Sequence, residues 1–123
     1  MAKPGNRVYL TLTARADLFR VMEWSVKEFG DRAALRYDAL IKQALRDIEE
    51  DPERPGSTEK PELMIEGGRT YHLSFSRGRL PYPGVKEPRH FLLYRRRGNV
   101  IEVARILHDA RDVKRNLPEA YRR

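Results

Sequence analysis

Between positions 14 and 48, apolar residues recur every three or four positions, and the pattern breaks at one place, Gly30. Residues with this spacing lie on one side of a helix, so the segment predicts a helix over Ala14–Phe29 and a second one from Asp31 onward. Gly30 favours the left-handed backbone conformation that ends many helices. With so short a connection, the two helices are expected to form an antiparallel hairpin, which needs a further layer to bury its apolar stripes.

Capping residues suggest where these helices begin and end. Thr13 is a suitable N-cap for the first helix, Asp17 suits the positive end of its dipole, and Asp31 is a suitable cap for the second helix. Asp51-Pro52 predicts the end of the second helix, because proline disfavours helical geometry in the residue before it. The apolar stripe of the second helix comprises Ala34, Tyr37, Ile41, Ala44, Leu45 and Ile48.

Four other segments show the alternation that is typical of strands. They are Arg7–Leu12, Arg69–Ser76, Arg89–Arg97 and Val100–His108. Gly98-Asn99 predicts a tight hairpin turn between the last two. In the last strand, alternation places Ile101, Val103, Arg105 and Leu107 on one side.

Segments rich in proline and glycine separate these elements. Pro52–Pro61 is expected to be a surface loop, and Ser76–Pro88 a long, mobile hairpin loop, because proline cannot sustain a strand ladder. Whether the loop at 77–88 touches a target is left open by the sequence. The segment 109–123 has weak helical potential, which Pro118 limits.

The order of these elements predicts an α+β fold with two layers in a single domain, residues 1–123. An N-terminal strand, the helical hairpin, three consecutive strands and a short C-terminal helix or tail follow one another. The strands are expected to form an antiparallel sheet with the hairpin on one face. The other face is then left uncovered and available to a partner. The chain has 123 residues, 40% of them hydrophobic, enough for one core.

Charge is distributed unevenly along the chain. Residues 1–68 hold 11 basic and 13 acidic side chains, a net charge of −2, while residues 69–123 hold 14 basic and 5 acidic, a net charge of +9. The whole positive excess of +7 therefore comes from the second half. A basic half-chain favours an anionic partner, either nucleic acid or an acidic protein segment, although solubility alone also explains it.

Composition excludes several classes of protein. Cysteine is absent, so disulfide scaffolds, thiol catalysis and thiolate zinc sites are excluded. No apolar run approaches the length that spans a bilayer, and the first residues lack the apolar stretch of a secretory signal, so we expect a cytoplasmic protein without membrane attachment. Three scattered histidines give no metal-ligand spacing, and neither a metal nor a cofactor is expected.

Five segments in this order resemble the ParE/RelE superfamily of bacterial type II toxins. They are "VYLTLTARADLF", "EFGDRA", "GGRTYHLSF", "RHFLLYRRRGNVIEVARILHDARD" and "NLP", and they extend from Val8 to about Pro118. The stretch "IEVARILHDARD" is the most diagnostic. The resemblance implies a small toxin encoded beside a labile antitoxin that wraps it and blocks its active surface. ParE-branch toxins inhibit DNA gyrase, whereas RelE-branch toxins cleave mRNA on the ribosome.

A ribonuclease without a metal needs a proton-transfer group and cations around the scissile phosphate. Lys60-Pro61-Glu62-Leu63 resembles a segment of ribonuclease toxins whose glutamate is the general base. Under that alternative Glu62, Arg69, Arg105 and His108 would form the site of a metal-independent endoribonuclease. An acidic run on and after the second helix, residues 47–53, would repel RNA, so we expect a ParE-like inhibitor that needs no catalytic residue.

Basic strand residues are candidates for binding, because long charged side chains within strands face water or a ligand. The expected residues for target or antitoxin binding are Arg69, Arg95, Arg105, His108 and Arg111. Charged edge strands that prevent aggregation are an equally good explanation of these arginines. His72 and His90 are expected to be at the surface or internally hydrogen-bonded, and Trp24 to lie at the margin of the core.

Overall fold

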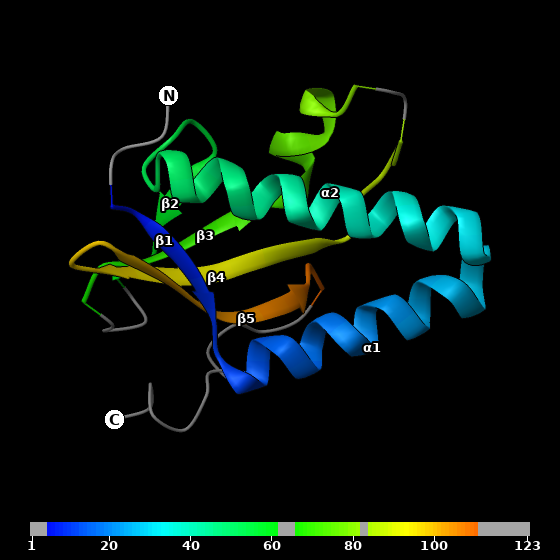
Figure 1. The fold of residues 1–123 in the computed structure, drawn as a ribbon, viewed down its shortest axis with the longest axis horizontal. Coiled ribbons are helices and arrows are strands. Elements are labelled where there is room, and N and C mark those ends of the chain that lie inside the picture. Colours follow the sequence, from blue (N-terminus) through cyan, green and yellow to red (C-terminus); the bar gives the residue numbers. More distant parts are fainter. Residues whose placement is uncertain (1–4, 62–65, 82–83, 111–123) are drawn as a thin grey trace.

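The structure is a computed structural model and describes residues 5–61, 66–81 and 84–110. Two long helices pack against a five-stranded sheet (Figure 1). The helices are α1 (Leu12–Phe29) and α2 (Asp31–Glu50), and a 3₁₀ helix, η2, covers Leu73–Arg79. The strands are β1 (Arg7–Leu10), β2 (Ser57–Glu59), β3 (Gly68–His72), β4 (His90–Arg97) and β5 (Val100–His108). The predicted α+β class, the N-terminal strand and the helical hairpin are confirmed.

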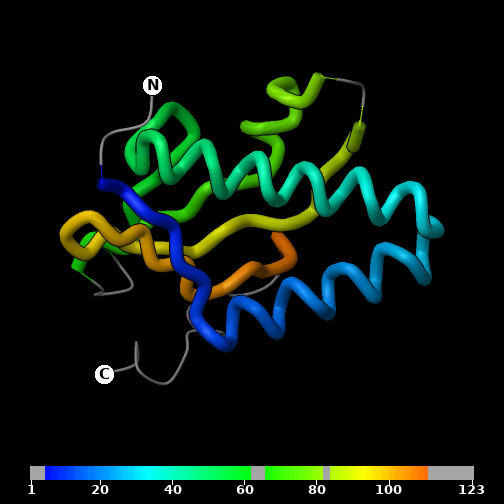
Figure 2. Tube along the Cα trace, in the orientation of Figure 1, coloured from blue at the N-terminus to red at the C-terminus, as the bar shows by residue number. Residues whose placement is uncertain are grey.

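The sheet is mixed rather than wholly antiparallel. Its strand order is β1-β5-β4-β3-β2, and β1 lies parallel to β5, with Arg7 opposite Val100. The other three pairs of neighbouring strands are antiparallel. The helices α1 and α2 run out and back between β1 and the later strands (Figure 2). The strand β2 then runs opposite to β1, and the three antiparallel pairings that follow give β5 the direction of β1.

The main core lies between the helices and one face of the sheet. All six predicted stripe residues of α2 are buried, and strand residues such as Leu92, Tyr94 and Ile101 pack against them. Tyr37 and Tyr71 lie in this core, as the pattern predicts. At about 25 cal/mol per Å² of apolar surface, burial of these side chains is the dominant stabilising contribution.

Two capping predictions are wrong. The N-cap of α1 is Thr11, whose Oγ1 accepts the N–H of Ala14, so the helix begins earlier than the pattern around Thr13 suggests. Asp31 is in the first turn of α2, and Gly30, with a φ of 90°, occupies the cap position. The positive φ of Gly30 and the end of α2 before Asp51 are confirmed, but the ψ of Gly30, 172°, is extended rather than left-handed helical.

A bulge changes the expected side-chain pattern of β5. Leu93 is opposite Arg105 and Tyr94 is opposite Val103, so Ala104 is an extra residue on the longer strand. As a result Ile106, not Arg105, joins Val103 in the core, and the prediction of one shared side from 101 to 107 is wrong.

The region after α2 also differs from expectation. The predicted loop over 52–61 contains β2, which pairs with β3. The predicted strand over 69–76 ends at His72, because Nδ1 of His72 accepts the N–H of Ser74 and the chain turns into η2. Arg77 donates a hydrogen bond to the carbonyl of Lys86 across the predicted loop.

The face of the sheet away from the helices is not as uncovered as predicted. Phe91, Leu93 and Leu107 point to this face and are buried. The expected tail from 111 onward lies outside the described residues. In the described part of the chain, no helix has the length and apolar character needed to cross a membrane.

Candidate functional site

Two histidines from neighbouring strands meet at one end of the sheet. His90 begins β4 and is opposite His108, the last residue of β5, and their ring centroids are 5.3 Å apart. The bulge at Ala104 sets this pairing, since without the extra residue His90 would be opposite Leu107. Both side chains lie on the same face as the helices and close to α1, where Trp24 contacts each ring edge-on.

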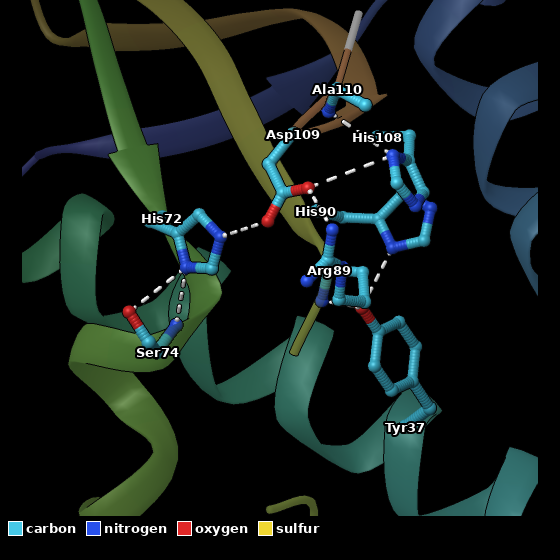
Figure 3. A network of polar contacts seen from close by, with 8 residues as sticks. All are labelled: Tyr37, His72, Ser74, Arg89, His90, His108, Asp109 and Ala110. Carbon is cyan, nitrogen blue, oxygen red and sulfur yellow. Dashed lines mark hydrogen bonds and ion pairs between the residues drawn. The ribbon is translucent and has the colours of Figure 1, made fainter. Parts of the chain in front are cut away.

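His90 is buried and held from α2. Its Nδ1 lies 2.6 Å from the hydroxyl of Tyr37, which also accepts the N–H of Arg89 (Figure 3). Burial is the main reason that the pKa of His90 falls to about 4, and the neighbouring His108 lowers it further. Burial likewise raises the pKa of Tyr37 to about 12. Both groups are therefore neutral at pH 7.

Asp109 joins the other side chains of this end of the sheet. In Figure 3 its carboxylate lies between His72 and His108, and one oxygen is 3.1 Å from Nε2 of His72. The other oxygen is 3.1 Å from Arg89. Burial alone would raise the pKa of Asp109, but the hydrogen bond from His72 and the charge of Arg89 outweigh it, so the pKa lies below its usual value. We call His72, His90, His108 and Asp109 the histidine cluster.

A cavity of about 620 Å³ opens between α1 and the end of β5. Its wall is about half polar and half apolar, and the cavity lies beside His90 and His108. Its lining includes Asp17, Arg20, Trp24, His90, Arg105 and His108. The volume is within the range of small-molecule sites.

Asp17 fixes one wall of this cavity. Pairing between β1 and β5 ends at Val103, which leaves the N–H of Ile106 without a strand partner, and a carboxylate oxygen of Asp17 accepts it at 3.0 Å. Arg105 donates two hydrogen bonds to Asp17, at 2.7 and 2.9 Å, and Arg20 donates a third. Asp17 is thus a buried link between α1 and β5, not the partner of the helix dipole that the sequence suggests.

The predicted arginines do not converge on one site. Arg105 and His108 line the same cavity, but Arg69 is opposite Tyr94, four residues along β4 from His90. At about 3.3 Å per residue, this separation is roughly 13 Å. Arg69 donates to Ser57 and to Glu59.

Arg95 pairs with Glu102 across the β4–β5 hairpin at 3.0 Å. Glu62 and Arg111, the remaining predicted site residues, lie outside the described residues. Across 5–61, 66–81 and 84–110, no three acidic or histidine side chains are grouped so that they could hold a metal ion.

Sequence reasoning missed the roles of Asp17, Tyr37 and Trp24. Counting equal numbers of residues in both directions from the Gly98-Asn99 turn brings His90 near the end of β5, so the sequence could have predicted that His90 lies close to His108. The sequence could not have predicted the contacts of Tyr37 and Trp24, because these depend on how the helices cross the sheet. The expectations that His72 and His90 are internally hydrogen-bonded, and that Trp24 is partly buried, are confirmed.

A solved structure and a family model match most of this chain. The structure of the chromosomal ParDE toxin–antitoxin system from P. aeruginosa superposes with a TM-score of 0.60 at 18% sequence identity, and the match covers 84% of this chain and 95% of that chain. At this identity the similarity establishes the fold alone. No curated protein has a sequence that matches this chain. The model of the ParE toxin of the type II toxin–antitoxin system, parDE, matches residues 8–113. The chain therefore belongs to the ParE family of type II toxins.

Proposed function

We propose that this protein is a toxin that inhibits DNA gyrase by binding to it, and that a cognate antitoxin neutralises it. The observation that carries the proposal is the match to the ParE family over residues 8–113. The same family membership makes a cytoplasmic site of action the expected one. Binding, rather than catalysis, is the proposed mode of action.

The placement of the candidate ribonuclease residues supports a binding mode. Arg105 is engaged by Asp17, and Arg69 is engaged by Ser57 and Glu59 at a distant position on the sheet. A phosphate clamp needs cations that converge on one oxygen position. These two do not converge, so they are better explained as structural residues.

An antitoxin partner fits the charge of the chain. The second half carries a net charge of +9, and an acidic segment that folds on binding would neutralise it. Within this proposal, Arg95, His108 and Arg111 contribute to the surface that the antitoxin or the target contacts. His108 is about one-third exposed at the mouth of the cavity.

A RelE-like mRNA endonuclease is the second candidate. The observation that favours it is the position of His108, which lies beside a cavity that also contains Arg20 and Arg105. Histidine near an arginine is suited to proton transfer at a phosphate. In this alternative His108 would act as the acid and Glu62 as the base, on ribosome-bound mRNA.

Pulse labelling after induction of the chain alone separates the two functions. We expect DNA synthesis to stop before protein synthesis, and His108→Gln to remain toxic. In vitro, the purified protein should inhibit gyrase supercoiling, and the cognate antitoxin should relieve the inhibition. Protein synthesis that stops first, together with a harmless His108→Gln variant and cleavage of translated mRNA, would replace the proposal with the endonuclease.

A further inference from the structure

The cavity beside the histidine cluster is lined by hydrogen-bond donors and positively charged side chains. We propose that this cavity binds the phosphate group of a small molecule. The proposal rests on the hydrogen-bond donors and the charge of the residues that line the cavity.

The hydrogen bonds of His90 determine which of its nitrogens carries the proton. The Tyr37 hydroxyl oxygen accepts the N–H of Arg89, and among the described residues Nδ1 of His90 is the acceptor available for the hydroxyl proton. We therefore assign Nδ1 as the acceptor and place the proton of the neutral imidazole on Nε2. His90 lines the cavity, and the described residues offer no hydrogen-bond partner for that N–H.

His108 is held in the same way. Its Nδ1 accepts the backbone N–H of Ala110 at 3.1 Å, and the nearest Asp109 oxygen lies 3.6 Å away, beyond hydrogen-bond distance, so we assign the ring proton to Nε2. Two imidazoles whose rings are 5.3 Å apart therefore both have their N–H group at Nε2, and both line the cavity. The cavity wall gains two hydrogen-bond donors from these rings.

The acidic side chain in the wall does not offset these donors. Asp17 already accepts four hydrogen bonds, two from Arg105, one from Arg20 and one from the N–H of Ile106. Four bonds saturate the two oxygens of a carboxylate. Arg20 uses one nitrogen for Asp17, and its side chain is 64% exposed, so most of its guanidinium is open to a ligand.

A ligand that fits this wall must supply acceptors and negative charge. A phosphate group has several acceptor oxygens, and hydrogen bonds between charged partners are about twice as strong as neutral ones. Trp24 adds a flat apolar surface beside the donors, and a volume of about 620 Å³ accommodates a ring as well as a phosphate. A nucleoside monophosphate has both parts, so we expect AMP to bind more tightly than inorganic phosphate.

Trp24 is the one tryptophan in the sequence and lines the cavity, so its fluorescence reports on occupancy. The full-length protein is titrated with inorganic phosphate and with AMP at constant ionic strength, with potassium chloride as the reference salt, and affinities are measured by calorimetry. Saturable binding of either probe supports the site. No saturable change with both probes, or the same change with chloride, overturns it.

Variants on the helical hairpin test the location. Arg20→Gln should weaken phosphate binding about tenfold, the loss expected for one charge-assisted hydrogen bond, and Arg20→Lys should recover part of it. Arg32→Gln removes the same charge from an exposed position on α2 outside the cavity and should have no effect. An equal loss in both glutamine variants would mean nonspecific attraction and would reject the site.

Nitrogen-15 spectra of the imidazole rings provide a second measurement that does not depend on the variants. We expect His90 and His108 to carry their protons on Nε2, and both signals to shift on addition of phosphate. A proton on Nδ1 of His90 would contradict the argument directly. Tight binding of an acidic peptide or of single-stranded RNA without any binding of phosphate or AMP would also overturn it, in favour of a macromolecular ligand.

Discussion

The two ends of the central sheet contain similar polar side chains but arrange them differently. Near β2, the hydroxyl of Tyr94 donates to the carbonyl of Pro52 and lies 2.5 Å from Oγ of Ser57, which also accepts from Arg69. At the other end, the histidine cluster bonds to Tyr37, Ser74 and Arg89.

The two ends differ in whether hydrogen-bond donors are left over once these internal hydrogen bonds are made. The Tyr94 network satisfies its members among themselves, whereas the histidine cluster leaves imidazole donors beside a cavity. A closed polar network stabilises a fold, and an open one retains the capacity to bind. The closed network has a structural role, and the open one is where we propose the phosphate site.

The largest effect should come from Asp17, which joins α1 to the edge of β5 at the histidine end. Replacing Asp17 with alanine leaves the mostly buried Arg105 without this partner, and a broken buried pair costs about 3–5 kcal/mol of unfolding free energy. Urea denaturation measures it. Asp38→Ala, which removes the more exposed partner of Lys42, is the control and should cost under about 0.5 kcal/mol. A loss for Asp17→Ala no larger than the control would show that β5 does not depend on this link.

Acid should destabilise the protein through His90. Its pKa is about 4 in the folded protein and about 6.5 when unfolded, so the unfolded state binds a proton first as pH falls. This stability is fully present above pH 6.5 and is lost progressively toward pH 4, by about 3 kcal/mol at 1.36 kcal/mol per pH unit.

Denaturation midpoints measured between pH 7 and pH 4 test this dependence. His90→Gln cannot titrate, so its stability curve should be flatter over the same range. Asp109 has a lowered pKa and contributes in the same direction below about pH 4. If His90→Gln shows the full pH dependence of the unmodified protein, the acid sensitivity has another source.

Two tyrosine variants compare the ends of the sheet directly. Tyr37→Phe and Tyr94→Phe each remove a buried hydroxyl, and each should cost about 1–2 kcal/mol in unfolding free energy. Only Tyr37→Phe should also weaken phosphate binding, because it releases His90 from the Nε2-protonated form. Calorimetric titration of both variants with phosphate measures this difference. Equal phosphate affinities in the two variants would contradict the proposed difference between the two ends of the sheet.

The smallest effect should come from Glu59, the exposed partner of Arg69. The Glu59 side chain is 74% accessible, and exposed ion pairs contribute about 0–1 kcal/mol. Glu59→Gln should therefore change the unfolding free energy by under about 1 kcal/mol and leave phosphate affinity unchanged. Loss of growth inhibition in this variant, with the fold intact, would place Glu59 on the functional surface.

The sequence predicts the architecture well because the spacing of apolar residues and the residues that end helices and form turns are local properties. The apolar stripe of α2, the break at Gly30 and the turn at Gly98-Asn99 each follow from residues close in sequence. Errors arise where tertiary contacts decide. The parallel placement of β1 depends on a partner more than 90 residues away, and the bulge at Ala104 carries no local signature.

The site was harder to predict than the fold. His108 and Arg105 were identified, and both line the cavity, but alternation placed Arg105 on the wrong face because the bulge reverses the pattern. The roles of Tyr37 and Trp24 depend on where two helices pass the end of a sheet. A tyrosine on an apolar stripe gives no sign that its hydroxyl will orient a histidine.

The pairing of β1 with β5 has a consequence for how the protein is made. Arg7 cannot pair with Val100 until residue 100 has left the ribosome, so the N-terminal strand emerges long before its partner exists. Contacts this distant in sequence form slowly. Because β5 also supplies Arg105 and His108, a nascent chain lacks the cavity beside the histidines until this last strand has been synthesised and has paired with β4.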